Sequence, residues 1–226
     1  MIPIRILITA GPTIEPIDPI RFISNLSTGL LGYEVAKEAK KRHYKVTLIT
    51  GPTHIAPPSK IKLLRIENAR ELQRELIKEL KKNDVLIMAS AVSDYRPASF
   101  SKKKIKSNKM LTLKLAANPD ILGSIPKKER KNKILIGFAL ETENLLKNAV
   151  KKAKAKGLDL IIANRISKKN VPFGMGPKTV YVIDRKGNKD KLEKASKSKI
   201  AGAILDRVNE LCYTRNWYSY EAGKIK

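Results

Sequence analysis

The chain has 226 residues, 42% of them hydrophobic, which is enough for one folded domain with a full core. The 47 lysines and arginines outnumber the 21 aspartates and glutamates. The net charge of +26 favours an anionic partner, such as nucleic acid, a membrane surface or phosphorylated small molecules, and a lysine-rich proteome is the plainer alternative. Most basic residues are lysines spread along the chain and only 5% of residues are aromatic, which argues against nucleic acid.

The rest of the composition indicates in which cellular compartment the protein is expected. No apolar run approaches the roughly 20 residues of a transmembrane helix, so no membrane association is expected. The first residues lead directly into a strand, so no signal peptide is expected. The single cysteine, Cys212, excludes an internal disulfide framework and predicts a reducing, cytoplasmic location.

Strand and helix patterns alternate along the chain, which predicts an α/β fold: a Rossmann-like, mostly parallel sheet flanked by helices. The predicted strands are Ile4–Thr9, Lys45–Thr50, Asp84–Ala89, Ile134–Ala139, Leu158–Ala163 and Thr179–Asp184. The predicted helices are Gly29–Arg42, Ala69–Lys82, Asn144–Lys156 and Ser198–Leu211, the last with Ser196 or Ser198 as its cap. Residues 1–212 are expected to form one domain and residues 213–226 a tail.

The segment Ser93–Leu115 interrupts this alternation. It is rich in lysine, so a projecting flap is expected, and a solvated loop is the plainer alternative. The alternating residues Leu111–Leu115 predict a strand with one covered face. A short helix is expected after it, capped by Asn118 with Pro119 in its first turn. Farther on, Lys186–Asn188 predicts a hairpin turn.

The loop between the first strand and the first helix is the leading candidate site. It is long, and its prolines stiffen it. Asn25, Ser27 and Thr28 offer hydrogen bonds, Gly29 allows a ligand close to the backbone, and Arg21 could meet a carboxylate or phosphate. The alternative is that Ser27 or Thr28 only caps the helix, which would explain one hydroxyl but not the whole loop.

Two later strand ends carry further candidates, because ligands bind at the carboxyl ends of strands in open α/β sheets. Small residues before Asp94 leave room there, and Asp94 could hold a ribose hydroxyl or help a metal ion; a plain turn is the alternative. Phe138 could stack on a base, although such a residue more often belongs to the core.

Lysines provide the last candidates. One lysine of the lysine-rich segment, which includes Lys104-Ile105-Lys106, could neutralise charge developing on a phosphate. Lys152 and Lys156, four residues apart, share a helix face, where exposed lysines usually only solubilise. His43, His54 and Cys212 lie far apart in sequence, which argues against a zinc site or a histidine-activated nucleophile. Any enzyme here is expected to work by positioning and electrostatics.

Two rival functions make distinct predictions. A dinucleotide-dependent oxidoreductase needs a short Gly-x-Gly-x-x-Gly turn after the first strand and an acidic residue after the second, but the second strand ends in Thr50-Gly51-Pro52. A nucleic-acid-binding module would bind duplex or single-stranded DNA at physiological salt without nucleotide turnover.

Ordered motifs over about residues 4–211 give the chain a specific resemblance. They are Thr9–Thr13, Glu15-Pro16, Asp18-Pro19, Arg21, Ile23–Asn25, Ser27–Gly29, Ala91–Arg96, Lys104–Lys106, Asn118–Leu122, Gly137–Thr142, Lys156–Asn164 and Phe173-Gly174. In these motifs the chain resembles the phosphopantothenate–cysteine ligases, which act in coenzyme A synthesis and are often fused behind a flavin-dependent decarboxylase. It departs from them at Ser90 and Ser93, where alanine is usual, and at Ala117, where lysine is common.

The resemblance implies a ligase that joins 4′-phosphopantothenate to L-cysteine. CTP, or ATP, activates the carboxylate as an acyl-nucleotide with release of pyrophosphate, Mg²⁺ supports this step, and the cysteine amine then displaces the nucleoside monophosphate. The resemblance also implies a homodimer paired through the flap. No decarboxylase portion is seen, so such a partner is expected to be fused in a longer protein or separate.

The resemblance also implies roles for individual residues. Asn25 would hold the carbonyl region of the acyl intermediate, Arg21 would lie near the substrate, and Lys104 would meet the nucleotide's charge from the flap. The nucleotide pocket would comprise Met88, Ala89, Ser90, Asp94, Asn118, Pro119, Asp120, Ile121, Phe138, Lys152 and Lys156 together with Lys104. The metal ligands stay open.

Overall fold

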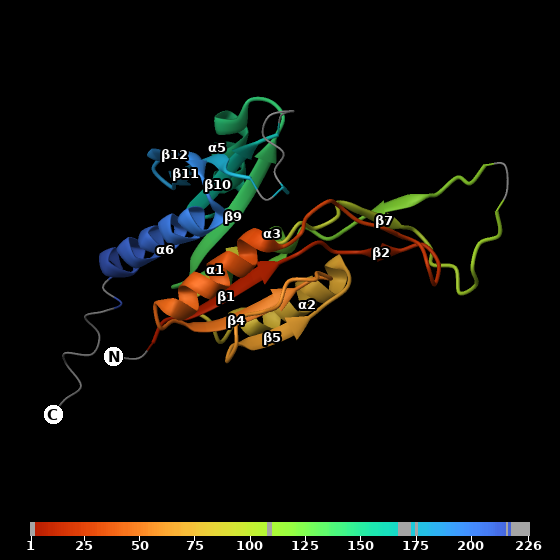
Figure 1. Cartoon of the computed structure of the whole chain (residues 1–226), viewed down its shortest axis with the longest axis horizontal. Coiled ribbons are helices and arrows are strands. Elements are labelled where there is room, and N and C mark those ends of the chain that lie inside the picture. The colour runs from red at the N-terminus through yellow and green to blue at the C-terminus, as the bar shows by residue number, and fades with distance from the viewer. Residues whose placement is uncertain (1–2, 108–109, 167–172, 175, 216, 218–226) are drawn as a thin grey trace.

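We describe the protein from a computed structural model. It covers residues 3–107, 110–166, 173–174, 176–215 and 217, and every statement below concerns these described residues (Figure 1). None of the described helices is both long enough and apolar enough to cross a membrane.

A mostly parallel sheet forms the centre of the molecule, which confirms the predicted fold (Figure 1). Its strands are β1 (Arg5–Ala10), β4 (Lys45–Thr50), β5 (Lys62–Arg65), β6 (Val85–Met88), β9 (Ile134–Glu141), β10 (Leu160–Arg165), β11 (Lys178–Asp184) and β12 (Lys189–Ala195). Among the described residues the strand order is β12-β11-β10-β9-β6-β1-β4-β5, parallel from β5 to β10 and antiparallel in the β10-β11-β12 part. The chain therefore reverses its direction of winding beside β1, and the carboxyl ends of β1 and β6 border a crevice.

Helices cover both faces of this sheet. Helices α1 (Leu30–Lys41) and α6 (Lys197–Thr214) lie side by side over one face, where they pack on Ile6 and Ile8 of β1 (Figure 1). Helices α2 (Ala69–Leu80), α3 (Ile121–Ser124) and α5 (Leu145–Lys156) cover the other face, and α4 (Lys127–Arg130) is a single turn near the surface. Alternate residues of β1 point to opposite faces, so Leu7 belongs to the second core.

Local signals explain where these helices begin and end. In α2, Leu72, Leu76 and Leu80 recur every four residues and are wholly buried, while the Asn68 side chain caps the first turn by accepting from the Glu71 N–H at 3.0 Å. In α6, Ser196 is the cap, as predicted, and the helix runs to Thr214, three residues beyond its expected end. The tail predicted for residues 213–226 therefore begins inside α6, and residues 216 and 218–226 lie outside the described part. Cys212, near the end of α6, is buried in the core.

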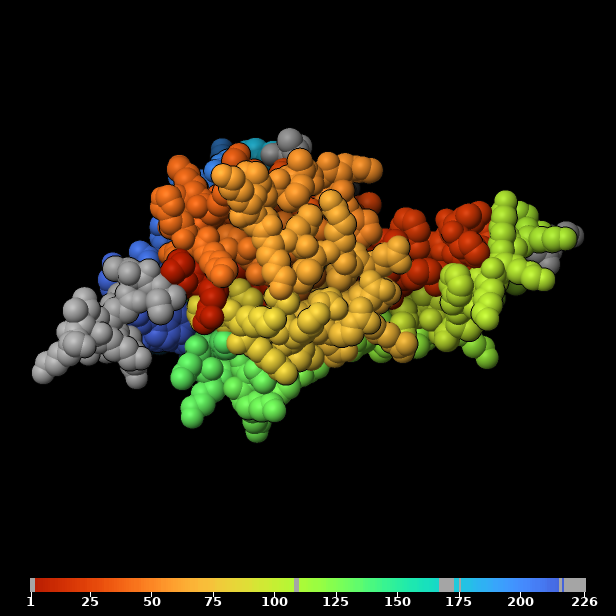
Figure 2. Space-filling model, turned by 90° about the horizontal axis from the view of Figure 1, so that it is seen from below, coloured from red at the N-terminus to blue at the C-terminus, as the bar shows by residue number. Residues whose placement is uncertain are grey.

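A flap projects from the sheet, as predicted (Figures 1 and 2). It consists of β2 (Glu15–Pro16), β3 (Phe22–Ile23), β7 (Tyr95–Pro97), β8 (Leu115–Ala117) and the chain between them. The loop after β1 and the lysine-rich segment lie against each other along this projection, joined where the Ser101 N–H donates to Ile17 O at 3.0 Å (Figure 2).

The predicted strand at Leu111–Leu115 is wrong. Only Leu115 lies in a strand, β8, which pairs with β7, and residues 110–114 have no regular structure. The predicted covered face is also exposed, since the exposed fraction of Leu111 is 54% and that of Leu113 is 37%. An alternating segment forms a stable strand only against a hydrogen-bonding partner and a covering layer. The Ala98 N–H donates to Lys114 O at 2.8 Å, but the exposed leucines show that no described layer covers the segment.

Candidate functional site

Two loops meet at the carboxyl edge of the sheet. The segment after β1 continues alongside the segment after β6: the Thr13 N–H donates to Ala91 O at 3.1 Å, and the Ala91 N–H donates to Gly11 O at 2.9 Å. On the other side of β1, Gly51 approaches so closely that a Cβ atom there would stand 1.7 Å from Pro12 O. The repeated Gly-Pro-Thr turns of neighbouring strands thus pack against each other, which fixes the floor of the crevice.

Two cavities open above this floor. The first, of about 450 Å³, is named here the Asp120 cavity. The predicted nucleotide-site residues that line it are Met88, Ser90, Asp94, Asn118, Pro119, Asp120, Ile121, Phe138, Lys152 and Lys156. Six different elements or loops contribute to this set, so the fold brings together residues that are far apart in the sequence.

The second, of about 400 Å³, is named here the Lys178 cavity and lies between the start of α1, the ends of β6 and β9, and β11. Ala89, also predicted for the nucleotide pocket, lines this one. The two cavities share Ser90, Val92, Asp94, Phe138 and Lys152. They therefore adjoin along one wall, and a molecule in each would meet its neighbour there.

The prediction that Asn118 caps the short helix is wrong. Its side chain donates to Ser93 O at 2.8 Å, and its backbone N–H donates to Asp94 O at 2.8 Å, so it ties the flap base to the loop after β6. Asp120 is the cap of α3 instead, because its carboxylate accepts from the Gly123 N–H at 2.9 Å. Asn and Asp are equally good caps, so the sequence alone could not choose between them.

Lys156 and Asp120 form an ion pair across the Asp120 cavity. Burial works to raise the pKa of Asp120, but the hydrogen bonds from Lys156 and the Gly123 N–H outweigh it and hold this pKa below its usual value. Lys152 has no such carboxylate in direct contact: its Nζ donates to Phe138 O at 2.8 Å, and burial lowers its pKa. Lys152 is thus the cation at the shared wall, and Lys156 is a cation already paired.

Ser93 has a side-chain oxygen that is buried without a partner among the described residues. The backbone N–H of Ser93 donates to Thr13 Oγ1 at 3.0 Å, and the residue lines the Asp120 cavity. The other departure, Ser90, donates its hydroxyl to Thr9 Oγ1 at 2.6 Å and is satisfied. Of the two unusual serines, Ser93 therefore has hydrogen-bonding capacity left for a ligand or water.

Asn25 lies beside the end of β6. Its amide donates to Ala91 O at 2.7 Å, and its Oδ1 accepts from the Ser27 N–H at 3.0 Å. It lines neither cavity, while the adjacent Ser27 and Thr28 line the Lys178 cavity. Gly29 is the N-cap residue of α1, but the hydroxyls of Ser27 and Thr28 also serve the start of this helix, because they accept from the Gly29 N–H at 3.3 Å and from the Leu30 N–H at 3.4 Å, respectively. The catalytic role of Asn25 stays a prediction.

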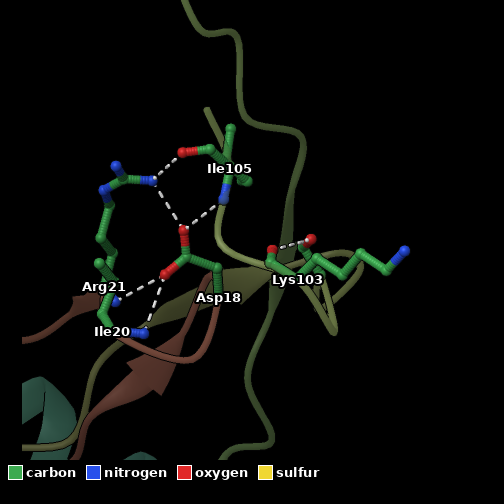
Figure 3. A network of polar contacts seen from close by, with 6 residues as sticks. Asp18, Ile20, Arg21, Lys103 and Ile105 are labelled. Atoms are coloured by element: carbon green, nitrogen blue, oxygen red, sulfur yellow. Dashed lines mark hydrogen bonds and ion pairs between the residues drawn. The ribbon is translucent and has the colours of Figure 1, made fainter. Parts of the chain in front are cut away.

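Arg21 and Lys104 lie in the flap. Arg21 donates to Asp18 Oδ2 at 2.7 Å and to Ile105 O at 2.9 Å, so it anchors the flap rather than lining a described cavity (Figure 3). Lys104 is exposed next to this anchor. Neither residue is within the lining of the two cavities in the described single chain, and their predicted roles stay predictions.

Lys178 and Lys197, which line the Lys178 cavity, were not predicted from the sequence. Lys178 is the first residue of β11 and only 7% exposed, and Lys197 is the first residue of α6. Their signal in the sequence was a lysine at an inward position of an alternating strand and a lysine directly after a helix cap. Both signals are weak, because the chain contains many other lysines.

Metal-binding capacity is limited to isolated carboxylates. Among the described residues no group of three or more His, Cys, Asp or Glu side chains could hold a metal ion. Mg²⁺ often takes only one or two protein carboxylates and completes its shell with phosphate oxygens and water. Asp94, which lines both cavities, fits that mode, while Asp120 is already paired with Lys156.

A family model covers nearly the whole chain: the DNA/pantothenate metabolism flavoprotein C-terminal domain matches residues 2–212. The chain belongs to this family. The resemblance inferred from the motifs is thereby confirmed. Of the motif residues, Asp94, Asn118 and Phe138 are among those that line the cavities.

Curated relatives place the family in longer proteins. The chain is 42% identical over 204 residues to the coenzyme A biosynthesis bifunctional protein CoaBC of Borreliella burgdorferi, covering 89% of this chain and 51% of that protein. It is 37% identical over 211 residues to a cysteine/cysteine sulfinic acid decarboxylase of an unknown prokaryotic organism, covering 92% of this chain and 59% of that protein. The chain thus spans about half the length of the curated relatives it matches.

Solved structures agree with the fold. The crystal structure of the C-terminal domain of CoaBC superposes with a TM-score of 0.80 at 32% identity, covering 93% of this chain and 96% of that one. A Cab2 variant in complex with phosphopantothenate-cysteine superposes with a TM-score of 0.73 at 19% identity, covering 94% of this chain and 89% of that one. At that lower identity the second likeness shows the fold alone.

Proposed function

We propose that this protein is a ligase that joins 4′-phosphopantothenate to L-cysteine through an acyl-nucleotide, with CTP as the activating nucleotide and ATP as the alternative. The observation that carries the proposal is the shared wall between two cavities. Joining an acid to a nucleotide requires two polyanionic molecules side by side, and the residues expected to hold the nucleotide line one of two adjoining cavities. The relationship to CoaBC supports the same reaction.

In the first step a carboxylate oxygen of phosphopantothenate attacks the α-phosphorus of the nucleotide, an O–P bond forms, and pyrophosphate leaves. Negative charge develops at the shared wall, where Lys152 supplies positive charge, and Lys156, paired with Asp120, lies farther into the Asp120 cavity. Mg²⁺, when bound, neutralises phosphate charge, and Asp94 is the residue that would hold it. Phe138 offers its ring to the nucleotide from the end of β9.

In the second step the amine of cysteine attacks the acyl carbon, the C–N bond forms, and the nucleoside monophosphate departs with the electrons of the C–O bond. Asn25 is held rigidly by Ala91 O and the Ser27 N–H at the entrance of this region. Its amide would orient the acyl group for attack. Lys104 would approach the nucleotide's charge from the flap, although it lines neither of the two cavities in the described chain.

We further propose a homodimer and a decarboxylase partner. The flap exposes Phe22, Phe100, Met110 and Leu111, each by more than half of its surface, which supports burial of this surface by a second copy. A flap from the second copy would also explain how Lys104 reaches a nucleotide. The half-length match to bifunctional relatives supports a decarboxylase that is fused in a longer protein or separate, and we expect both to be cytoplasmic.

Pyrophosphate release with phosphopantothenate, cysteine and Mg²⁺ tests the proposal, with CTP and ATP run in parallel. Release must depend on phosphopantothenate; a flat trace with both nucleotides contradicts the assignment. Asn25→Asp loses the N–H donated to Ala91 O and adds a negative charge, and Lys104→Gln removes a cation. Each should reduce amide formation more than about tenfold, or roughly 1.4 kcal/mol in the barrier.

Lys103→Gln is the matched control, because Lys103 is also exposed in the flap and its side chain points away from the Asp18 anchor (Figure 3). It should keep activity within about twofold of the wild type. If Asn25→Asp and Lys104→Gln keep full activity as well, the residue roles are wrong even though the family stands.

A further inference from the structure

The Lys178 cavity holds two lysines that the reaction described above does not use. Lys178 is 93% buried, and its side chain has no hydrogen bond or ion pair to any of the residues the structure describes. Lys197 lines the same cavity, and its pKa is lowered, first by burial and then by the charge of Lys178. Two neighbouring cations without a counter-charge are costly in a partly desolvated site.

Two helices begin at the same cavity and reinforce its positive potential. Helix α1 begins at Leu30, and its N-cap residue Gly29 has a left-handed φ of 80° and no side chain to accept from the N–H groups of the first turn. Only the first of these groups has a side-chain acceptor among the described residues: the Leu30 N–H donates to Thr28 Oγ1 at 3.4 Å. Helix α6 begins with Lys197 itself, and the first turns of both helices lack acidic residues. Helix N-termini attract anions. Asp94, at the opposite wall, is the acidic residue among the described lining residues.

We propose that Lys178, Lys197 and the N-terminus of α1 form a binding subsite for a phosphate group, at the end of the crevice away from the reacting carboxylate. The inference rests on the proposed function, since both substrates of that reaction carry such a group. The phosphate monoester of the acid and the terminal phosphates of the nucleotide share this chemistry. The acid is the better fit, because the residues expected to hold the nucleotide line the adjoining Asp120 cavity.

Lys178→Met and Lys197→Met test the subsite, with Lys199→Met as the matched control, because Lys199 is an exposed lysine in the same first turn of α6 as Lys197. Values of kcat/KM are measured by pyrophosphate release. Each cavity variant should lose at least tenfold in kcat/KM for phosphopantothenate, and the control should stay within twofold. With unphosphorylated pantothenate as the acid, all forms should react equally, because the phosphate is no longer there to be bound.

A rise in KM for CTP, with that for phosphopantothenate unchanged, would keep the subsite and assign it to the nucleotide. Unchanged constants for both substrates would overturn it. If even the wild type shows no turnover, the proposed function fails but the subsite is still judged by calorimetric titration with phosphopantothenate and with CTP: binding weakened in the cavity variants supports it, and equal binding overturns it.

The folded state provides a further readout. Lys178→Met removes a buried, unpaired ammonium group, so its melting temperature should equal or exceed that of the wild type. Should Lys178→Met fold poorly, Lys197→Gln decides alone, because Lys197 is only partly buried at the start of α6 and its replacement disturbs the core less.

Discussion

Gly51 sets the distance between the loop that follows β4 and the loop that follows β1. A Cβ atom at this position would lie 1.7 Å from Pro12 O and 2.8 Å from Pro12 C, both rigid backbone atoms. The Gly51 N–H also donates to Ala10 O at 3.0 Å, so the loop cannot move away without losing this bond. Any side chain at residue 51 must therefore displace the loop that carries Asn25.

Gly51→Ala should lower the free energy of unfolding by at least about 2 kcal/mol, because overpacking against backbone cannot relax through a side-chain rotation. Chemical denaturation measures this loss. Gly176→Ala is the control, since nothing lies within 4 Å of a Cβ atom there, and it should change stability by less than about 0.5 kcal/mol. Equal stability of both variants would show that the contact between the loops is dispensable.

At the scale of elements, Asp18 anchors the flap. Its carboxylate is inaccessible to solvent and accepts from the N–H groups of Ile20, Arg21 and Ile105 at 3.0, 2.9 and 3.1 Å and from the Arg21 guanidinium at 2.7 Å (Figure 3). Burial works to raise the pKa of Asp18, but these donors hold it below its usual value. One carboxylate thus joins the loop after β1 to the lysine-rich segment.

Asp18→Asn should loosen this junction, because an amide cannot accept from every donor that the carboxylate serves. The protection of the Ile105 amide against hydrogen exchange should fall at least tenfold at neutral pH. In the wild type the depressed pKa means that the anchor holds above the unfolded value, about 3.9, and weakens as the pH falls through the folded one. Asp190→Asn, at an exposed carboxylate, is the control; unchanged Ile105 protection in Asp18→Asn would contradict the anchor.

The helices and parallel strands could be predicted because their signals are local. A buried strand such as β6 is a continuous apolar run, and α2 repeats leucine every four residues. The edge strand β5 was missed because its residues are only half-buried and carry lysine and arginine, which gives no apolar run. Leu111–Leu115 showed a strand pattern, but a pattern does not reveal whether a partner strand is present.

The same distinction between local signals and spatial neighbours applies to the site. The motif positions could be assigned because the resemblance names them, and the fold brings ten of them to the Asp120 cavity. Lys178 and Lys197 could not be found, because their importance comes from burial beside each other, and the sequence does not tell a buried lysine from its many exposed counterparts. Where Arg21 and Lys104 act in an assembly was equally beyond the sequence of one chain.

At the scale of the whole molecule, the flap is the surface through which the proposed homodimer would form. Its apolar residues include Met110, 82% exposed, on a projection that extends well beyond the sheet and its helices (Figure 2). The net charge of +26 makes two copies repel each other. Association through the flap therefore sets apolar burial against charge repulsion, and added salt should favour it by screening the charges.

Sedimentation analysis should find a dimer whose dissociation constant falls as NaCl is raised from low to physiological concentration. Replacing Leu111 and Leu113 together by lysine should weaken the dimer more than about tenfold, by the loss of buried apolar surface and added repulsion. Tyr213→Lys, at an exposed apolar residue on α6 far from the flap, should leave it unchanged. If the protein is a monomer at every concentration tested, the flap is not a dimer interface.

The position of Cys212 has a chemical consequence. The chain carries one sulfhydryl, it is wholly buried on the inner side of α6, and burial raises its pKa to about 12. At neutral pH almost none of it is the reactive anion. In the proposed reaction, in which free cysteine is a reactant, the folded protein thus presents no thiol of its own with which that cysteine could form a mixed disulfide.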